Sequence, residues 1–169
     1  MSKVFWAGLR VGWIRAPRPI VERLMRLKIL ADMGTGVLSQ AIAAAALPRL
    51  GDAAAERTAG LIEGHAVLAE ALSRRLPDWT WETPEGGCIL WVRLPGGDAR
   101  EFAQVAQRYG VSVVPGQVLS ADGGHADRLR LPFVWEPAVL EEAVRRLALA
   151  WGLYSGGLAG AEAPASIIV

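Results

Sequence analysis

The sequence predicts a mixed α/β chain in which three helices, one of them long, precede a small α+β lobe. Two patterns predict this class. Apolar residues recur at helical spacing over residues 19–76, and they alternate with a period of two over residues 88–94. The length of 169 residues fits one domain or two small lobes, and the 52% of hydrophobic residues is enough for a core.

A strand and a helix are predicted near the start of the chain. Residues 11–16 are rich in β-branched and aromatic side chains, which favours a strand. Pro19 suits the first turn of the next helix, whose apolar residues continue at helical spacing to Ala31. Residues 34–36 contain two glycines and are expected to end that helix.

Two more helices are predicted before the small lobe. An alanine-rich helix over residues 35–50 is expected to end at Gly51, where Asp52 can cap the following helix. That helix, residues 53–76, would be roughly 35 Å long at ~1.5 Å per residue, which suits a connecting rod. One face of it collects five residues: Leu61, His65, Leu68, Leu72 and Leu76.

Short strands and two helices are predicted for residues 77–152. Asp98 can cap one helix, and Pro137 can begin another that ends near Gly152. Residues 153–169 are rich in Gly, Ala and Ser, and we expect them to form a flexible tail. Four segments have the pattern of strands: residues 79–82, 88–94, 111–114 and 128–133.

Charge and cysteine content argue against several classes of protein. The 18 Lys+Arg nearly balance the 17 Asp+Glu, so this segment gives no reason to expect nucleic-acid or membrane binding. Cys88 is the single cysteine, which excludes an intramolecular disulfide and suits a reducing compartment. Because neither a signal peptide nor a span of sufficient apolar length is visible, we expect a cytoplasmic protein.

Lys3 and Arg10 are candidate ligands for an aldehyde that carries a phosphate. A neutral lysine forms an imine with an aldehyde, and nearby positive charge favours the neutral form. The planar guanidinium of arginine can bind a phosphate with two hydrogen bonds, and Gly8 and Gly12 would let the backbone approach a ligand closely. Pyridoxal phosphate has this chemistry. On spacing alone, a solvated lysine and a surface arginine are the commoner interpretation.

Arg128 and Arg130 stand two apart on a predicted strand and therefore share one of its faces. Either could bind a carboxylate through its forked guanidinium. A half-exposed strand with a basic outer face is the commoner arrangement. Gly86 and Gly87 fit a plain hairpin turn, or a place where the backbone leaves room for a substrate.

His65, His125 and Cys88 are interpreted as structural residues. His65 lies on the apolar helix face and is expected to be packed, and His125 lies in a Gly/Asp loop and is expected to be solvated. Cys88 is expected to be a buried strand residue without a basic neighbour to activate it. Since no partner stands at metal-ligand spacing from these residues, we predict no metal site.

Four motifs in one order, over about 150 residues, resemble those of the class I/II aminotransferases, the fold-type I pyridoxal-phosphate enzymes. The first resembles the family's lysine segment and the last its strand with the substrate-binding arginine. The residues of the first and last motifs are most similar to those of the MocR group. In that group, an aminotransferase-like domain follows a GntR-type winged-helix domain. The motifs are SKVFWAGLRVGW (residues 2–13), PEGGCILWVRLP (84–95), GVSVVPGQVLSADGG (110–124) and RLRLPF (128–133).

The resemblance implies roles for four residues. Lys3 would form the imine with pyridoxal 5'-phosphate and act in catalysis. Arg10 would bind the cofactor phosphate, with Ser2 as a further contact. Arg130 would hold the α-carboxylate of an amino acid.

The resemblance also implies the C-terminal portion of the PLP-dependent transferase fold. Residues 1–34 would be a remnant of the cofactor-binding large domain, residues 35–76 the interdomain helices, and residues 77–152 the small C-terminal α+β domain. In the family, the part before the lysine supplies an aspartate for the ring nitrogen and further cofactor contacts, which this sequence lacks. We therefore expect a truncated chain that is inactive by itself.

Two functions are compatible with this resemblance. The complete protein would carry out amino-acid transamination as a homodimer, or it would be a MocR/GntR-type transcription regulator that senses an amino acid or the cofactor as effector. DNA would be bound only through a winged-helix domain, which is absent from this sequence. Both functions use the same lysine and arginines, so the sequence does not distinguish them. A fragment with only a packing role is a third possibility.

Overall fold

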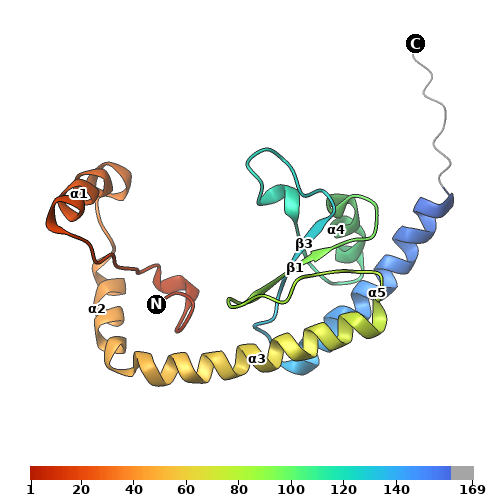
Figure 1. Ribbon diagram of the computed structural model, residues 1–169, viewed down its shortest axis with the longest axis horizontal. Helices are drawn as coiled ribbons and strands as arrows, with labels where there is room; N and C mark the ends of the chain where they lie inside the picture. Colours follow the sequence, from red (N-terminus) through yellow and green to blue (C-terminus); the bar gives the residue numbers. More distant parts are fainter. Residues whose placement is uncertain (161–169) are drawn as a thin grey trace, which may run out of the picture. The chain divides into compact units, whose positions relative to one another are not determined.

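The computed structural model describes residues 1–160, and the chain divides into two compact units, Met1–Ala59 and Gly60–Val169 (Figure 1). We call them the N-terminal unit and the C-terminal unit. The long helix α3 (Leu50–Arg75), drawn in yellow, contributes residues to both. Helix α3 confirms the long helix that the sequence predicts. None of the helices within residues 1–160 combines the length and apolar character that a membrane span requires.

Helical segments make up the ordered elements of the N-terminal unit. Pro19 lies in the first turn of α1, as predicted, and Met33 follows it in the left-handed conformation. The 3-10 helix η1 contacts α2, and each contributes one buried residue, Leu9 and Ala43. The elements before α3 are η1 (Ala7–Leu9), α1 (Arg18–Asp32), α2 (Val37–Ala46) and η2 (Leu47–Arg49).

Two predictions for this unit are wrong. Residues 11–16 form no strand, because their composition favours extended backbone but no strand within residues 1–160 pairs with them. Gly51 and Asp52 do not separate two helices, because both lie inside the first turn of α3. The Asp52 carboxylate is favourable there, close to the positive end of the helix dipole.

The C-terminal unit is built on a three-stranded antiparallel sheet in the order β1-β3-β2. Strand β1 (Ile89–Arg93) pairs with β3 (Arg128–Pro132), and β3 also pairs with the short β2 (Val114–Pro115). The remaining elements are α4 (Ala99–Arg108), the 3-10 helix η3 (Gly116–Val118) and α5 (Pro137–Gly160).

One face of this sheet is buried against helices. Leu90 and Val92 of β1 and Leu129 and Leu131 of β3 are at most 5% exposed. The alternation predicted for residues 88–94 is thereby confirmed. The same cluster contains buried residues from the three helices: Leu68 and Leu72 of α3, Phe102 and Ala106 of α4, and Val144 and Leu147 of α5.

Asp98 caps α4, as predicted, and also joins three segments. Its Oδ1 accepts hydrogen bonds from the backbone N–H groups of Arg100 (2.7 Å) and Glu101 (3.3 Å). Its Oδ2 accepts one from Gln117 Nε2 (2.9 Å), and its backbone N–H donates to the Tyr154 hydroxyl (2.8 Å). Burial raises the pKa of that Tyr154 hydroxyl. The start of α4 is therefore held to η3 and to α5.

Two predicted strands are shorter in the structure than the sequence indicates. Residues 79–82 contribute only one isolated bridge, between Thr80 and Arg93. In the segment over residues 111–114, only Val114 is a strand residue. Both segments lie at the edges of a small sheet, where few partner strands are available.

The last helix is longer than predicted, since α5 continues past Gly152 to Gly160. The rings of Trp151 and Tyr154 pack on Phe102, with centroid distances of 5.4 and 5.7 Å. This packing outweighs the cost of about 1 kcal/mol that a glycine imposes inside a helix. The rest of the expected tail, residues 161–169, lies outside the described residues.

Two glycines of α3 allow a matched test of this packing. A Cβ added at Gly64 would lie 2.3 Å from the Phe133 carbonyl oxygen, whereas a Cβ at Gly60 meets nothing within 4 Å. We expect Gly64→Ala to lower the free energy of unfolding by roughly 1–3 kcal/mol, because the backbone must move. Gly60→Ala should raise it by about 0.5–1 kcal/mol, because alanine favours the helix. Denaturant unfolding measures both, and equal effects of the two variants would contradict the packing described.

Candidate functional site

Lys3 lies in an exposed turn at the start of the N-terminal unit. The turn is closed by the backbone N–H groups of Val4 and Phe5, which both donate to the Met1 carbonyl oxygen (3.2 and 3.0 Å). Ser2, in the same turn, is half-buried. Within residues 1–160, Lys3 forms no salt bridge. Its amine is therefore free of an acidic partner in the described structure.

Arg10 follows η1 directly and has a left-handed backbone, with φ 50° and ψ 33°. This conformation is uncommon for residues other than glycine, and such residues cluster at functional sites. The side chain is exposed and, in the part of the chain that the structure describes, forms no salt bridge. Buried Leu9 anchors the preceding turn, so the backbone at Arg10 has a fixed support.

The ring of Trp6 lies where a side chain at Gly8 would be. A Cβ at this position would lie 2.3 Å from the ring of Trp6. The absence of a side chain at Gly8 therefore makes room for that ring. A Cβ at Gly12 would meet nothing within 4 Å, so the second glycine of the motif has open space around it.

Arg130 lies at the centre of the three-stranded sheet. It pairs with Trp91 of β1 on one side and with Val114 of β2 on the other. The buried faces of its neighbours Leu129 and Leu131 place Arg130 on the opposite face of the sheet, as predicted. The residue is half-buried.

Three arginines share this face, but they differ in their charge partners. Arg93 Nε donates to Asp127 Oδ2 at 2.7 Å, and Arg128 Nε lies 3.8 Å from Asp127 Oδ1. For Arg130, no salt bridge is found within residues 1–160. One carboxylate thus serves two of the guanidinium groups and leaves the third available to a ligand.

The loop before β3 carries two residues that sequence reasoning did not assign to the site. The ring of His125 packs edge-on against Trp91, with a centroid distance of 5.6 Å and an interplanar angle of 81°. His125 is exposed, as expected, yet this contact gives it a defined position. Asp127 was missed because its partner Arg93 is 34 residues away in the sequence, so no local motif indicates the pair.

His65 and Cys88 lie apart from these groups. His65 packs edge-on against Phe133 with a centroid distance of 5.4 Å, which agrees with a packed histidine. Cys88 is half-buried where a buried residue was expected, because it precedes β1 instead of lying within it. Its carbonyl oxygen accepts a hydrogen bond from Phe133 N (3.1 Å). Among residues 1–160, no group of three or more His, Cys, Asp or Glu side chains could hold a metal ion.

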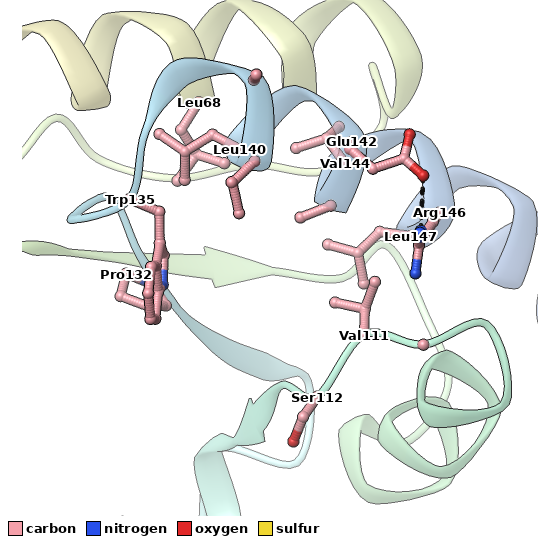
Figure 2. Close-up of a pocket in the computed structure, with 14 residues that line it drawn as sticks. Leu68, Val111, Ser112, Pro132, Trp135, Leu140, Glu142, Val144, Arg146 and Leu147 are labelled. Carbon is pink, nitrogen blue, oxygen red and sulfur yellow. Dashed lines mark hydrogen bonds and ion pairs between the residues drawn. The ribbon is translucent and has the colours of Figure 1, made fainter.

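An apolar groove of about 600 Å³ runs along the first half of α5 (Figure 2). Trp135, Val139 and Val111 are among its lining residues. At one end Glu142 accepts a hydrogen bond from Arg146 (Figure 2). It also accepts two from Arg145. Because its charged groups pair with each other, the groove offers no free ionic group for chemistry.

Comparison with known proteins places the chain in a family. Residues 1–147 match the family "Aminotransferase class I and II". The chain belongs to this family, and the resemblance of its four motifs is confirmed.

Two curated relatives represent the two kinds of protein that match. Aromatic-amino-acid aminotransferase 1 of Thermococcus litoralis is 31% identical over 154 residues, which cover 87% of this chain and 36% of that protein. The uncharacterized HTH-type transcriptional regulator YdfD of Bacillus subtilis is 30% identical over 172 residues, which cover 94% of this chain and 32% of the regulator. The chain thus spans about a third of the length of these relatives.

A solved structure agrees with the predicted fold. LysN, the α-aminoadipate aminotransferase from Thermus thermophilus, superposes with a TM-score of 0.83 at 29% identity. The match covers 95% of this chain and 41% of LysN, whose crystal structure holds N-(5'-phosphopyridoxyl)-L-leucine. The prediction of a partial α/β fold of the aminotransferase type is confirmed.

The ion pair at the end of the groove gives a pH-dependent prediction. Hydrogen bonds from Arg145 and then Arg146 lower the pKa of Glu142 to about 2. We expect Arg145→Gln to raise this pKa toward about 4.3, the usual value for glutamate. NMR titration of the Glu142 carboxyl carbon measures it.

The sign of the effect on stability follows from the lowered pKa of Glu142. Stabilisation by this pair is complete above the unfolded-state pKa and is lost as the pH falls through about 2. In Glu142→Gln, the loss of folding stability at low pH should be smaller by the part that Glu142 and its two arginine partners contribute. An unchanged Glu142 pKa in Arg145→Gln would contradict the hydrogen bonding described.

Proposed function

We propose that this chain supplies the cofactor lysine and the substrate-binding arginine of a pyridoxal-phosphate-dependent aminotransferase. The observation that carries the proposal is Arg130, a strand-borne arginine on the open face of the sheet with no acidic partner within residues 1–160. Membership in the aminotransferase family suggests that the ligand of this free guanidinium is an amino acid. Arginine binds a carboxylate with two parallel hydrogen bonds, and every amino-acid substrate carries one.

The residues of the N-terminal unit fit pyridoxal phosphate by their chemistry. Lys3 offers an amine without an ion-pair partner in the described residues, and Arg10 offers an exposed guanidinium on a fixed left-handed turn. An amine matches the aldehyde of the cofactor, and a guanidinium matches its phosphate. Ser2 directly precedes Lys3 in the sequence and would be a further phosphate contact.

When bound, the cofactor supplies an aldehyde that reacts with amines and a ring that accepts electrons from the Cα of the amino acid. Lys3 Nζ would hold the cofactor before the amino acid arrives. Once displaced by the amino group, Lys3 Nζ would accept the proton from Cα as a general base and then donate it, as a general acid, to the carbon that receives the amino group. Arg130 would fix the α-carboxylate of the amino acid and so limit the orientations that its Cα–H bond can take.

These roles assign each segment of the chain to a part of the aminotransferase fold. Within this proposal, residues 1–34 belong to the cofactor-binding domain, residues 35–76 form the helices between domains, and residues 77–152 form the small domain. The complete protein would act as a homodimer in the cytoplasm. In the chain alone, the N-terminal unit exposes fourteen large apolar side chains between Trp6 and Leu47. This exposed apolar surface supports the proposal that other parts of the complete protein cover the unit.

A sensing function is the second candidate, and specific relatives favour it. Two HTH-type transcriptional regulators of Bacillus subtilis, YdfD and YisV, are 30% and 34% identical to this chain. In that case the same residues would bind pyridoxal phosphate or an amino acid as an effector, without efficient turnover. The DNA would be bound by a winged-helix domain outside this sequence.

Lys3 can be tested by chemical trapping, because the sequence contains only one other lysine. Lys28 is paired with Asp32 at 2.8 Å and serves as an internal control. After incubation with pyridoxal phosphate and borohydride reduction, peptide mass spectrometry should find the pyridoxyl group on Lys3 in preference to Lys28. Lys3→Arg should remove that label, because arginine forms no imine. Equal labelling of the two lysines would remove Lys3 from the site.

Arg130 can be compared with its neighbour Arg128, which shares the strand face but is close to Asp127. We expect Arg130→Ala to weaken binding of L-leucine by roughly 2–5 kcal/mol, the usual loss when one partner of a buried charge pair is removed. Arg128→Ala should weaken it by less than about 1 kcal/mol. Calorimetric titration of both variants measures this. Equal losses would reject the assignment of Arg130.

A further inference from the structure

The surroundings of Arg130 limit what a bound carboxylate can carry. Directly opposite residues of neighbouring antiparallel strands have Cβ atoms about 4.5–5.5 Å apart. Trp91 and Val114 hold these positions on the two sides of Arg130, and Pro132 is the next residue along β3 on the same face. A group bound to the guanidinium is therefore bordered by an indole, an isopropyl group and a pyrrolidine ring.

The charged groups next to this position contact one another. Along β3 the remaining neighbour on the face is Arg128, which lies 3.8 Å from Asp127. Asp127 also accepts the 2.7 Å hydrogen bond from Arg93. A second carboxylate on the ligand would have to compete with Asp127 for these two guanidinium groups, so an acidic side chain gains little here.

Trp91 is held in place by an ordered loop. His125 packs edge-on against the indole and has a left-handed backbone with φ 61°. A Cβ at Gly116 would lie 2.4 Å from the His125 carbonyl oxygen, so the two segments touch closely. Within the loop, Gly124 N donates to Asp122 Oδ1 (3.0 Å) and Ser120 Oγ (3.1 Å).

The Ser120 hydroxyl also donates to Asp122 and lowers the pKa of that carboxyl. These contacts fix the loop from two directions, through its own hydrogen bonds and through its packing on η3. The His125 ring is therefore a supported wall and not a freely solvated side chain.

We propose that Trp91 and His125 form an aromatic wall beside Arg130 that receives the side chain of the bound amino acid. The ligand class is an amino acid with an aromatic or long apolar side chain, in preference to an acidic one. The inference rests on the proposed role of Arg130 in binding the α-carboxylate. Trp91 would contribute apolar contact area and ring-edge contacts, and His125 would keep the indole in position.

Two simple carboxylates test the wall without any reaction at the cofactor. Propanoate offers only the carboxylate and a short chain, and 3-phenylpropanoate adds one phenyl ring. We expect the chain to bind 3-phenylpropanoate about tenfold more tightly than propanoate, since burying a phenyl ring is favourable. Calorimetric or NMR titration gives both dissociation constants. Failure of the chain to bind either carboxylate would overturn the inference together with the proposed function.

Variants of the wall should change the ratio of the two constants. Trp91→Ala should reduce the tenfold preference to about twofold or less, and Trp91→Phe should retain most of it. His125→Asn keeps a residue that tolerates the left-handed backbone while removing the ring, and it should reduce the preference in part. Leu149→Ala, which shortens an exposed apolar side chain of α5, is the control and should leave the ratio unchanged.

The two failures can be told apart. If Arg130→Ala leaves the binding of both carboxylates unchanged, the proposed carboxylate site is wrong. If Arg130→Ala abolishes both but Trp91→Ala and His125→Asn leave the ratio as in the wild type, the site stands and the aromatic wall is overturned. Trp91→Phe keeps an aromatic ring beside His125, so its ratio of dissociation constants tests the inference even if Trp91→Ala does not fold. A lost preference in Trp91→Phe would also contradict the inference.

Discussion

The pairing register between β1 and β3 is the constraint on which the rest of the C-terminal unit depends. It sets Leu90 opposite Leu131 on the face that the helices cover, and Trp91 opposite Arg130 on the other face. A slip of one residue would exchange the two faces of the slipped strand. An arginine would then lie in a core of leucine and phenylalanine without a partner, at a prohibitive cost. Burial of the leucines therefore determines where the arginine is presented.

The second constraint is the distribution of charge on the open face. Asp127 pairs with both Arg93 and Arg128, so that within residues 1–160 Arg130 is the one arginine of this face without a carboxylate partner. This selectivity matters for binding, because three unpaired arginines would attract any anion without orienting it. Apolar neighbours around Arg130 strengthen its interaction with a ligand, because they lower the local dielectric and exclude water. The fold thus separates the arginine that can bind from those that support it.

The sequence predicts the parts of this arrangement that depend on local pattern. Alternation in residues 88–94 and 128–133 was sufficient to put Arg130 on the face opposite the leucines. The strand expected over residues 11–16 fails because a strand depends on a partner as well as on composition. Trp91 and His125 went unassigned because their contact requires the β1–β3 register and the conformation of a loop, and neither is encoded in neighbouring residues. The choice of Arg130 over Arg128 came from family resemblance, and Asp127 gives it a physical reason.

The central claim is that Arg130 is the guanidinium of this sheet that binds a carboxylate. NMR spectroscopy of the arginine Nε–H groups tests it most directly, with acetate as the titrant and signals assigned through single Arg→Lys variants. The account predicts a saturable shift of the Arg130 signal, while those of Arg93 and Arg128 stay where Asp127 holds them. Equal shifts for the three arginines, or a shift confined to Arg93 and Arg128, would contradict it.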